Sequence, residues 1–327
     1  MITRLGPAGR GTAVSSVRVG LSDISKLEHW IALELNAEMS YISRMDRLMK
    51  IQDTSLLMRG AKSILIFLVK YGRGKEPPTG YGKIASYALY SDYHDTIKDQ
   101  ITKFVTENGL YVDMFRVYVD TGPVEERGIG SQAGLGWIGR NSMLINRELG
   151  SFTFIGTAVT DVVIDSQRFP QADLCGRCTR CIDSCPTHAI RSDRTVDSNL
   201  CISYHTIENR GVIPKGVAAK MDNMIFGCDI CNDVCPWNFS KEGVRSDWIE
   251  DRDFLTAMKL EDLAYVDKES FNDKFKSAAL KRAGDAGLAR NATVALFNSG
   301  REDIVRDVAM NFDDVRGSQA RALLGSK

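Results

Sequence analysis

The 327-residue sequence lacks three features that would each have assigned it to a broad class of proteins. It has no excess charge, because 42 lysines and arginines balance 42 aspartates and glutamates, so nothing global indicates a nucleic-acid or membrane partner. It has no apolar run near the ~20 residues that cross a bilayer, and its longest clear run is 64–69. Residues 1–16 contain neither the apolar core of an export signal nor a twin-arginine pair. We therefore expect a cytoplasmic protein with no membrane partner.

Cysteine is also scarce, but its eight copies form one ordered pattern. The first run has the spacing C-x2-C-x2-C-x3-C-P that bacterial ferredoxins use to hold [4Fe–4S] clusters, and it consists of Cys175, Cys178, Cys181 and Cys185. The second run lacks its first cysteine, because Ile225 stands there, and it consists of Cys228, Cys231 and Cys235. Cys201 restores the count to two sets of four.

The ligand sets follow from a rule of two-cluster ferredoxins, in which the cysteine before proline ligates the other cluster. We therefore assign the first cluster to Cys175, Cys178, Cys181 and Cys235. The second cluster takes Cys185, Cys201, Cys228 and Cys231. Two structural zinc sites are the alternative, but zinc does not require three cysteines at this spacing before Cys-Pro. Disulfides are disfavoured, because close C-x2-C pairs in a long chain without a secretory leader indicate metal or redox chemistry.

The length suggests two or three domains, and the 43% of hydrophobic residues suffices for substantial cores. Strands alternate with helices before the cysteines, which predicts an α/β domain over 17–170 after a loose leader at 1–16. Its strands are expected at 17–21, 64–69, 115–119 and 151–159, and its helices at 26–36, 92–108 and 125–133. The continuously apolar 64–69 is typical of a sheet covered on both faces.

Two further segments follow. Residues 171–240 are expected to form a ferredoxin-like domain that is organised by its metal rather than by a large core. Residues 241–327 are predicted to be helical, with helices at 285–298, 301–312 and 317–324. One such pair resembles a HEAT-type repeat, and a plain helical cap is the alternative. A lone pair cannot bury both faces, so it must pack on the rest of the protein or on a partner.

A glycine-rich segment at 119–145 offers a candidate site outside the cysteines. Glycines this dense allow backbone to approach a ligand closely, although tight connections between short elements are the alternative. The segment is neither a P-loop nor a GxGxxG turn that opens a helix. Asp120 follows the strand at 115–119, where open α/β sheets place ligands. Its carboxyl could donate a proton if burial raises its pKa, but an aspartate at a strand end is more often a cap or turn residue.

These motifs occur in the order found in epoxyqueuosine reductases, a family of cobalamin-dependent iron–sulfur enzymes of tRNA modification, which the sequence closely resembles. The similarity covers about 17 to beyond 298. Its motifs are D-x-G-P…E-R, A-G-L-G-W-x-G-x-N, the first cysteine run, C-I-S-Y-x-T-I-E-x-x-G, G-C-D-x-C-x3-C-P-W-N and L-x-R-N-A, at 120–127, 133–141, 175–186, 201–211, 227–238 and 288–292.

The resemblance implies a cobalamin-binding α/β domain, two [4Fe–4S] clusters in the middle domain and a HEAT-like helical tail. It implies reduction of epoxyqueuosine to queuosine at the tRNA wobble position by a monomer that takes electrons from a separate donor. Asp120 matches the proton donor of the family, and Glu126 is the fallback, although pairing with an arginine or capping a helix suits Glu126 better. Asn141, Ser203 and His205 lie where family members line the corrin.

The chain departs from the family pattern in two places. Arg140 replaces the lysine of a Gly-Lys-Asn or Gly-Lys-His segment and keeps its charge, and the helical tail is shorter than in many relatives, which would reduce the grip on tRNA. A basic stretch could still meet phosphates, although a solvated helix face is the alternative. It comprises Lys274, Lys276, Lys281, Arg282 and Arg290.

The chemistry suits this assignment. Deoxygenation of an epoxide needs two electrons and protonation of the departing oxygen, and one-electron clusters with a cobalt cofactor can supply the electrons. A cobalamin reductase of another substrate, such as an organohalide, is the first alternative, but such relatives commonly carry a twin-arginine leader. A non-catalytic electron carrier is the second, and it leaves the segment around Asp120 without a purpose.

Overall fold

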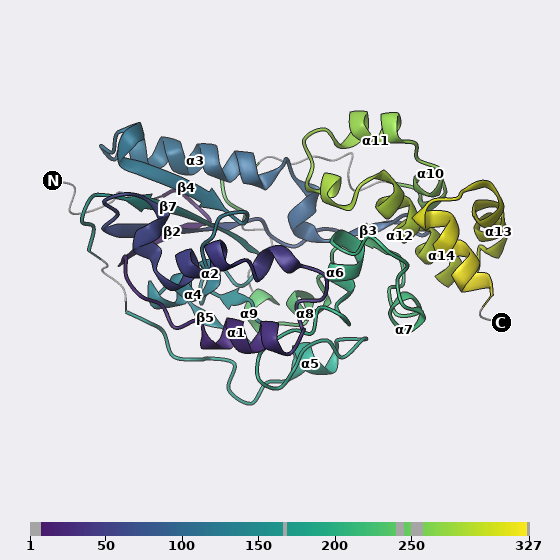
Figure 1. Cartoon of the computed structure of the whole chain (residues 1–327), viewed down its shortest axis with the longest axis horizontal. Coiled ribbons are helices and arrows are strands. Elements are labelled where there is room, and N and C mark those ends of the chain that lie inside the picture. The colour runs from purple at the N-terminus through teal and green to yellow at the C-terminus, as the bar shows by residue number, and fades with distance from the viewer. Residues whose placement is uncertain (1–7, 166–168, 240–244, 250–257, 326–327) are drawn as a thin grey trace.

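A four-stranded antiparallel sheet organises the first half of the molecule (Figure 1). The computed structural model describes residues 8–165, 169–239, 245–249 and 258–325. The strand order is β1-β2-β7-β4, with β1 at Thr12–Arg18, β2 at Ser63–Lys70, β7 at Thr153–Thr160 and β4 at Phe115–Val119. Strand β2 pairs with β7 from Ser63 opposite Thr160 to Lys70 opposite Thr153.

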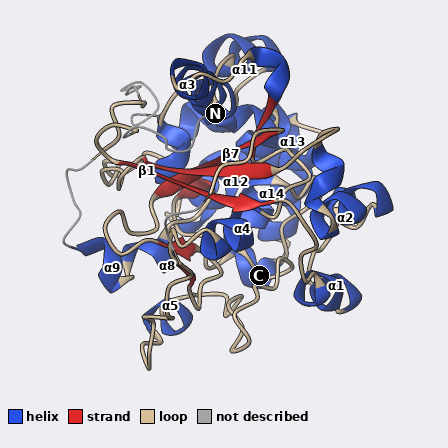
Figure 2. Cartoon of the chain, turned by 90° about the vertical axis from the view of Figure 1, so that its left-hand side faces the viewer, coloured by secondary structure: helices blue, strands red, loops and turns tan. Residues whose placement is uncertain are grey.

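Both faces of the sheet are covered, as the apolar run in β2 predicts. Successive side chains of a strand point to opposite faces, and all eight residues of β2 are buried. Leu65 and Phe67 pack with Ile101 of α3 (Tyr93–Glu107) on one face. Ile66 packs with Ile129 of α4 (Glu126–Gln132) on the other. Figures 1 and 2 show α3 and α4 on opposite sides of the strands.

The structure corrects three expectations for this half. The first strand begins at Thr12, so the predicted leader is wrong for 12–16, while 1–7 lie outside the described residues. The first helix, α1 (Ser25–Ala32), ends before Asn36, because the chain turns through positive φ at Glu34. The sheet is antiparallel throughout, so the rule that places ligands at strand ends of open parallel sheets does not apply to Asp120.

Short elements connect these strands and helices. They are η1 (Ser40–Ile42), α2 (Met45–Gln52), η2 (Thr54–Leu57), β3 (Lys83–Ile84), η3 (Ser86–Leu89), η4 (Val112–Met114), β5 (Trp137–Ile138) and β6 (Leu144–Ile145). The cysteine segment is equally fragmented. It contains α5 (Arg180–Asp183), α6 (Ile202–Ile207), α7 (Lys215–Ala218), β8 (Met224–Phe226), α8 (Ile230–Asp233) and α9 (Pro236–Phe239). Strand β8 pairs in parallel with β3 and so joins this segment to the first half.

The C-terminal part is helical, as predicted. It contains α10 (Leu260–Ala264), α11 (Lys268–Phe275), η6 (Ala279–Ala283), α12 (Asp285–Asn298), α13 (Glu302–Asn311) and α14 (Val315–Leu324). Ten residues of α12 are buried, because α12 packs on every side. No helix within the described residues is long and apolar enough to span a membrane.

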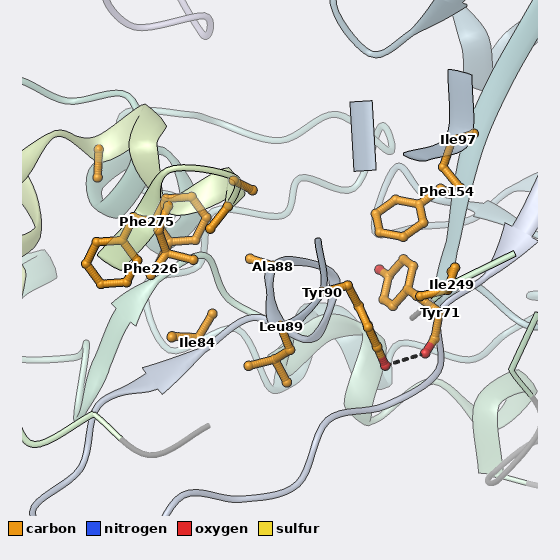
Figure 3. Packing of buried hydrophobic residues seen from close by; sticks show 14 of the residues in the cluster. Tyr71, Ile84, Ala88, Leu89, Tyr90, Ile97, Phe154, Phe226, Ile249 and Phe275 are labelled. Atoms are coloured by element: carbon orange, nitrogen blue, oxygen red, sulfur yellow. Dashed lines mark hydrogen bonds between the residues drawn. The ribbon is translucent and has the colours of Figure 1, made fainter. Parts of the chain in front are cut away.

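One hydrophobic core runs through all three segments. It joins Phe67 of the sheet to Phe226 of β8, Phe275 of α11 and Leu288 of α12. Figure 3 shows Phe226 and Phe275 packing near Ile84, with Tyr71 and Phe154 further along the same core. The helical tail therefore packs on the rest of the protein, which is one of the two arrangements that the sequence left open.

Candidate active site and metal centres

The eight thiols lie in two neighbouring groups. Burial and the charges of Cys175 and Cys181 raise the pKa of Cys235 to about 11. Burial and the charges of Cys201 and Cys185 raise the pKa of Cys228 to about 12. Each pre-proline cysteine thus lies among thiols of the other run. Charge interactions link Cys175, Cys178, Cys181 and Cys235 to one another, and likewise Cys185, Cys201, Cys228 and Cys231, although Cys231 also interacts with Cys181. The assignment of these sets as cluster ligands stays a prediction.

The surroundings of the thiols fit iron–sulfur clusters. Trp137 Nε1 donates to Cys175 Sγ at 3.5 Å, and the Ala189 amide donates to Cys185 Sγ at 3.3 Å, which are contacts that stabilise thiolates. Arg140 donates through Nη2 to the Gly176 carbonyl, and its buried Nε has no hydrogen-bond partner among the described residues.

The spacing of the thiols also bears on the kind of metal centre. Within the described residues, no three His, Cys, Asp or Glu side chains converge as ligands of a single ion. The four thiolates of a [4Fe–4S] cluster each bind a different iron, so they need not converge in that way. Iron cations would also stabilise buried thiolates whose pKa values are raised in the protein alone.

The loop that contains Cys228 packs on and hydrogen-bonds to η3 and the residue before it. A Cβ on Gly227 would lie 2.5 Å from the Cβ of Ala85, so only glycine permits this approach, and its φ is +71°. The Asp229 carboxylate accepts hydrogen bonds from the Ser86 amide and hydroxyl, both at 2.6 Å. Burial raises the pKa of the next residue, Tyr87, and the charges of Asp120 and Asp229 raise it further. Tyr87 therefore lies between the second thiol group and Asp120.

Asp120 lies where the starts of two helices meet the end of β4. Its φ of +58° is left-handed, and its amide donates to Oε1 of Glu126, the first residue of α4, at 2.7 Å. Tyr93 at the start of α3 donates its hydroxyl to Asp120 Oδ2 at 2.9 Å. His94 Nε2 lies 3.3 Å from the same oxygen. The side chain of Asp120 is still 62% exposed, so a substrate can reach it.

At neutral pH, His94 and Glu126 hold the protons of this site, and Asp120 is ionised. The hydrogen bond from His94, and then that from Tyr93, hold the pKa of Asp120 below its usual range against the effect of burial. Burial lowers the pKa of His94, but hydrogen bonds to Asp120 and Asp92 outweigh it and raise that pKa to about 9. Burial, followed by the charge of Asp120, raises the pKa of Glu126 to about 8. Burial does raise the pKa of Asp120, but the hydrogen bonds outweigh it, so the net rise that a proton donor would need is absent.

Glu126 has neither of the roles that the sequence favoured for it. Its carboxyl accepts a hydrogen bond from the backbone amide of Asp120 and so stabilises the left-handed turn at the end of β4. The neighbouring Arg127 instead donates to the carbonyl of Ser142 at 2.8 Å. The glycines of this segment also serve internal packing, since a Cβ on Gly136 would lie 2.2 Å from the Ile145 carbonyl oxygen. The alternative of tight connections therefore accounts for them.

Sequence analysis missed His94 and Tyr93. The available signal was the Asp-Tyr-His start of the predicted helix 92–108, in which Asp92 is the N-cap and its side chain accepts from the His94 amide. Nothing in the chain order, however, places this helix start over the end of β4.

The three expected corrin contacts share no hydrogen bond with the group around Asp120 in the described part of the chain. Asn141 is buried and donates to Asn232 Oδ1 of α8 at 3.3 Å. His205 is buried, with Nε2 donating to the Asn199 carbonyl at 2.8 Å and Nδ1 accepting from Asn209 at 3.0 Å. Burial lowers the pKa of His205, so the ring is neutral. Ser203 lies half-buried in the same helix, α6.

The predicted basic stretch divides into buried and exposed parts. Arg290 is 1% exposed and donates to the carbonyls of His205, Asn209 and Gly211, so its inclusion among phosphate contacts is wrong. Arg282 forms a two-pronged pair with Glu208 at 2.8 and 2.7 Å. The remaining members are exposed, namely Lys274, Lys276 and Lys281.

Known relatives assign the family. An epoxyqueuosine reductase from Cyclobacterium marinum is 40% identical over 273 residues, which cover 81% of this chain and 86% of the relative. The chain belongs to the epoxyqueuosine reductase family. The Synechocystis member is 38% identical over 83% of this chain and 94% of its own, and the Escherichia coli member is 31% identical over 90% and 81%.

Family models agree with this assignment. The model of epoxyqueuosine reductase QueG matches 52–121, and that of a 4Fe-4S double cluster binding domain matches 174–238. The epoxyqueuosine reductase of Bacillus subtilis, solved with its catalytic loop swung out of the active site, has a TM-score of 0.83 at 25% identity and covers 97% of this chain and 86% of its own. A family structure solved with an epoxyqueuosine-modified tRNA stem loop has a TM-score of 0.85 at 24% identity, over the same shares.

Proposed function

We propose that the chain reduces epoxyqueuosine in tRNA to queuosine with electrons delivered through two [4Fe–4S] clusters. One observation carries the proposal. In this member of the family, the second thiol group and the group around Asp120 meet at Tyr87. Two thiols of the second group, Cys228 and Cys231, flank Asp229, which is hydrogen-bonded to Ser86. The adjacent Tyr87 lies near the charges of both Asp229 and Asp120. Electrons and protons can therefore arrive at one place.

Cobalamin is the second cofactor that we propose. When bound, it supplies a cobalt centre that passes electrons to the substrate. Tyr87 and Tyr93 pack edge to face with ring centroids 5.8 Å apart, and Tyr93 donates to Asp120, so we propose that these aromatic rings border the macrocycle. Asp120, Asn141, Ser203 and His205 are the proposed contacts. The two nitrogens of His205 are already engaged, so its contact would come from carbon or backbone atoms.

Asp120 would be the side chain that touches the epoxide oxygen. Its left-handed turn, held by Glu126, presents the carboxyl to solvent while Tyr93 and His94 bind one of its two oxygens. General acids positioned in this way typically contribute ~10²–10⁴-fold to rate. The exposed lysines at 274, 276 and 281 would meet phosphates of the tRNA.

We also infer the arrangement of the chain. The segments 17–170, 171–240 and 241–327 would be the cobalamin-binding, cluster-binding and HEAT-like parts of one monomer, which takes electrons from a separate donor. Packing of α14 against both α12 and α13 supports a repeat-like helical layer. The core that crosses all three segments means that they fold together and not as independent domains.

The decisive experiment is turnover of tRNA that carries epoxyqueuosine. Protein reconstituted anaerobically with iron, sulfide and cobalamin should form queuosine, detected by mass spectrometry of the nucleosides. Asp120→Asn keeps the size of the side chain and removes the transferable proton, so we expect retained iron and cobalamin with turnover reduced by ~10²–10⁴-fold. Glu126→Gln is the matched comparison, because its amide oxygen can still accept from the Asp120 backbone.

Two outcomes would contradict the proposal. Reduction of an organohalide without any conversion of the tRNA would favour the other class of cobalamin reductase. Near-normal turnover by Asp120→Asn with a large loss in Glu126→Gln would move the role of proton donor to Glu126.

A further inference from the structure

The proposed reaction needs more protons than Asp120 holds. Conversion of an epoxide to an alkene breaks both carbon–oxygen bonds, consumes two electrons and two protons, and releases the oxygen as water. The clusters supply the electrons. A carboxyl group carries at most one proton, and neighbouring groups keep Asp120 ionised at neutral pH. If the chain has the proposed function, a neighbouring group that holds a proton at neutral pH would load Asp120 faster than water does.

His94 has the geometry of that group. Its ring bridges two carboxylates, with Nδ1 2.7 Å from Asp92 Oδ1 and Nε2 3.3 Å from Asp120 Oδ2. The ring is held by a stack, because it lies 4.1 Å from the Tyr93 ring, which in turn lies 4.6 Å from Phe154 of β7. The side chain is 31% exposed, so water can return a proton to it.

We propose that His94 stores the proton for the epoxide oxygen and passes it through Asp120. The proton on Nε2 moves to Asp120 Oδ2, and the carboxylic acid so formed donates it to the departing oxygen. His94, now neutral, takes a proton from solvent water. A second proton then passes from His94 through Asp120 to the same oxygen, which leaves as a water molecule. His94 is thus a positioning and relay residue, whereas Asp120 touches the substrate.

The charges around His94 keep the stored proton on its ring until the epoxide oxygen draws it through Asp120. Asp92 and Asp120 accept from the ring on either side, Tyr93 stacks on it, and Lys281 faces Asp92. Glu126 and Arg127 act on Asp120 from α4. With the pKa of His94 at about 9 and that of Asp120 lowered, the proton resides on His94 throughout the neutral range.

The pH dependence of turnover tests the relay. The unaltered holoenzyme should be nearly constant between about pH 6 and pH 8 and lose activity above about pH 9, as neutral His94 accumulates. His94→Gln keeps a hydrogen-bond donor for Asp120 but has no proton to give. It should lose at least ~10-fold at neutral pH and recover towards pH ~5, where water can protonate Asp120. His29→Gln, an exposed histidine of α1, is the matched control and should behave as the unaltered enzyme.

Asp92→Asn is the second variant, in case His94→Gln fails to fold. It leaves Asp120 untouched and removes one of the two hydrogen bonds that raise the pKa of His94, so the alkaline limb should move to lower pH. A profile for His94→Gln or Asp92→Asn that matches the unaltered enzyme would overturn the relay.

Histidine NMR gives a readout that does not depend on activity. The chain has four histidines, so the signal of His94 in ¹⁵N-histidine-labelled holoprotein can be assigned by its loss in His94→Gln. We expect it to titrate near 9 and to move to lower pH in Asp120→Asn. Titration near the ordinary ~6.5, unaffected by Asp120→Asn, would refute the coupling. Absence of queuosine formation by the unaltered enzyme would instead refute the proposed function, while the titration still decides whether the two side chains are coupled.

Discussion

The four-stranded sheet and the cysteine segment at 174–238 obtain their order from different sources. Strand β2 buries all eight of its residues and β7 seven of its eight, in cores on both faces. In the cysteine segment, α5, α8 and α9 have four residues each. The two apolar clusters that it shares with neighbouring segments, around Ile202 and Trp137, are small. Helices this short have almost no stability of their own in water.

The difference indicates which part of the molecule depends on metal. Burial of apolar side chains on both faces stabilises the sheet without a metal. Ligand binding must supply much of the order of the cysteine segment, as it does in small metal-binding domains. The proposed chemistry lies at the junction, where Asp229 bonds to Ser86 on one side and β4 presents Asp120 on the other. Variants on the two sides should therefore fail in different ways.

Cys201→Ala should have the largest effect, and it should disturb the cysteine segment while leaving the sheet intact. Removal of this thiol leaves the second cluster one ligand short, so iron should fall from about eight to about four atoms and turnover should be lost, because the electron route is broken. Hydrogen exchange should rise in 174–238 and remain slow in β2. The measurements are iron content, queuosine formation and exchange by mass spectrometry. Full iron content with full activity would show that Cys201 is not a ligand.

Phe67→Ala should have the converse effect. Phe67 is fully buried in β2 and contacts the edge of Phe104 with ring centroids 5.4 Å apart. Truncation of such a side chain costs ~3–5 kcal/mol of unfolding free energy. The folded fraction should still bind about eight iron atoms. Tyr111→Ala is the control, because Tyr111 is 73% exposed. A loss of iron that precedes unfolding in a denaturant series would contradict the division between the regions.

Glu126→Gln should produce the smallest and most specific change, a shift in how stability depends on pH. Burial raises the pKa of Glu126 from 4.5 to about 8 in the folded chain. The folded state therefore binds the proton more tightly, so the stability of the unaltered protein is complete below pH 4.5 and falls as the pH rises towards 8. Glutamine has no proton to lose, so the variant should gain on the unaltered protein across this interval, by a difference on the order of a few kcal/mol.

Chemical denaturation at several pH values measures this difference. Glu107→Gln is the control, because its carboxylate is 64% exposed and forms only a surface pair with Lys103, worth about 0–1 kcal/mol. A gap between Glu126→Gln and the unaltered protein that stays constant from pH 4.5 to 8 would mean that Glu126 is ionised in the folded state.

Local sequence patterns predicted many of the helices and strands. The strand at Phe115–Val119 and the helix at Asp285–Asn298 have the predicted bounds, because apolar periodicity and glycine or serine stops are local signals. The antiparallel order could not be predicted in the same way. Strand β2 pairs with β7, far along the chain, and an apolar run buried on both faces carries no information about direction.

The site was predicted where chemistry depends on residue type and missed where it depends on packing. Cysteine spacing and the resemblance proposed the thiols and Asp120 as site residues, and these roles stay predictions. The bridge from His94 to Asp120, and the bond from the Asp120 amide to Glu126, depend on where α3 and α4 begin in space. Arg290 was assigned to the surface by its charge, although its neighbours Leu288, Ala289 and Ala292 already indicate a buried helix.

The position of Arg290 has a consequence for the order of events during synthesis. A ribosome-bound chain that has emerged only as far as Cys235 already has every thiol, yet it lacks the guanidinium that binds the carbonyls of 205–211, directly after Cys201. Burial lowers the pKa of that guanidinium to about 10, which leaves it charged in the cell. The second cluster can therefore reach its final surroundings only after α12 has left the ribosome and docked, so completion of the metal site is a late step in the life of the nascent chain.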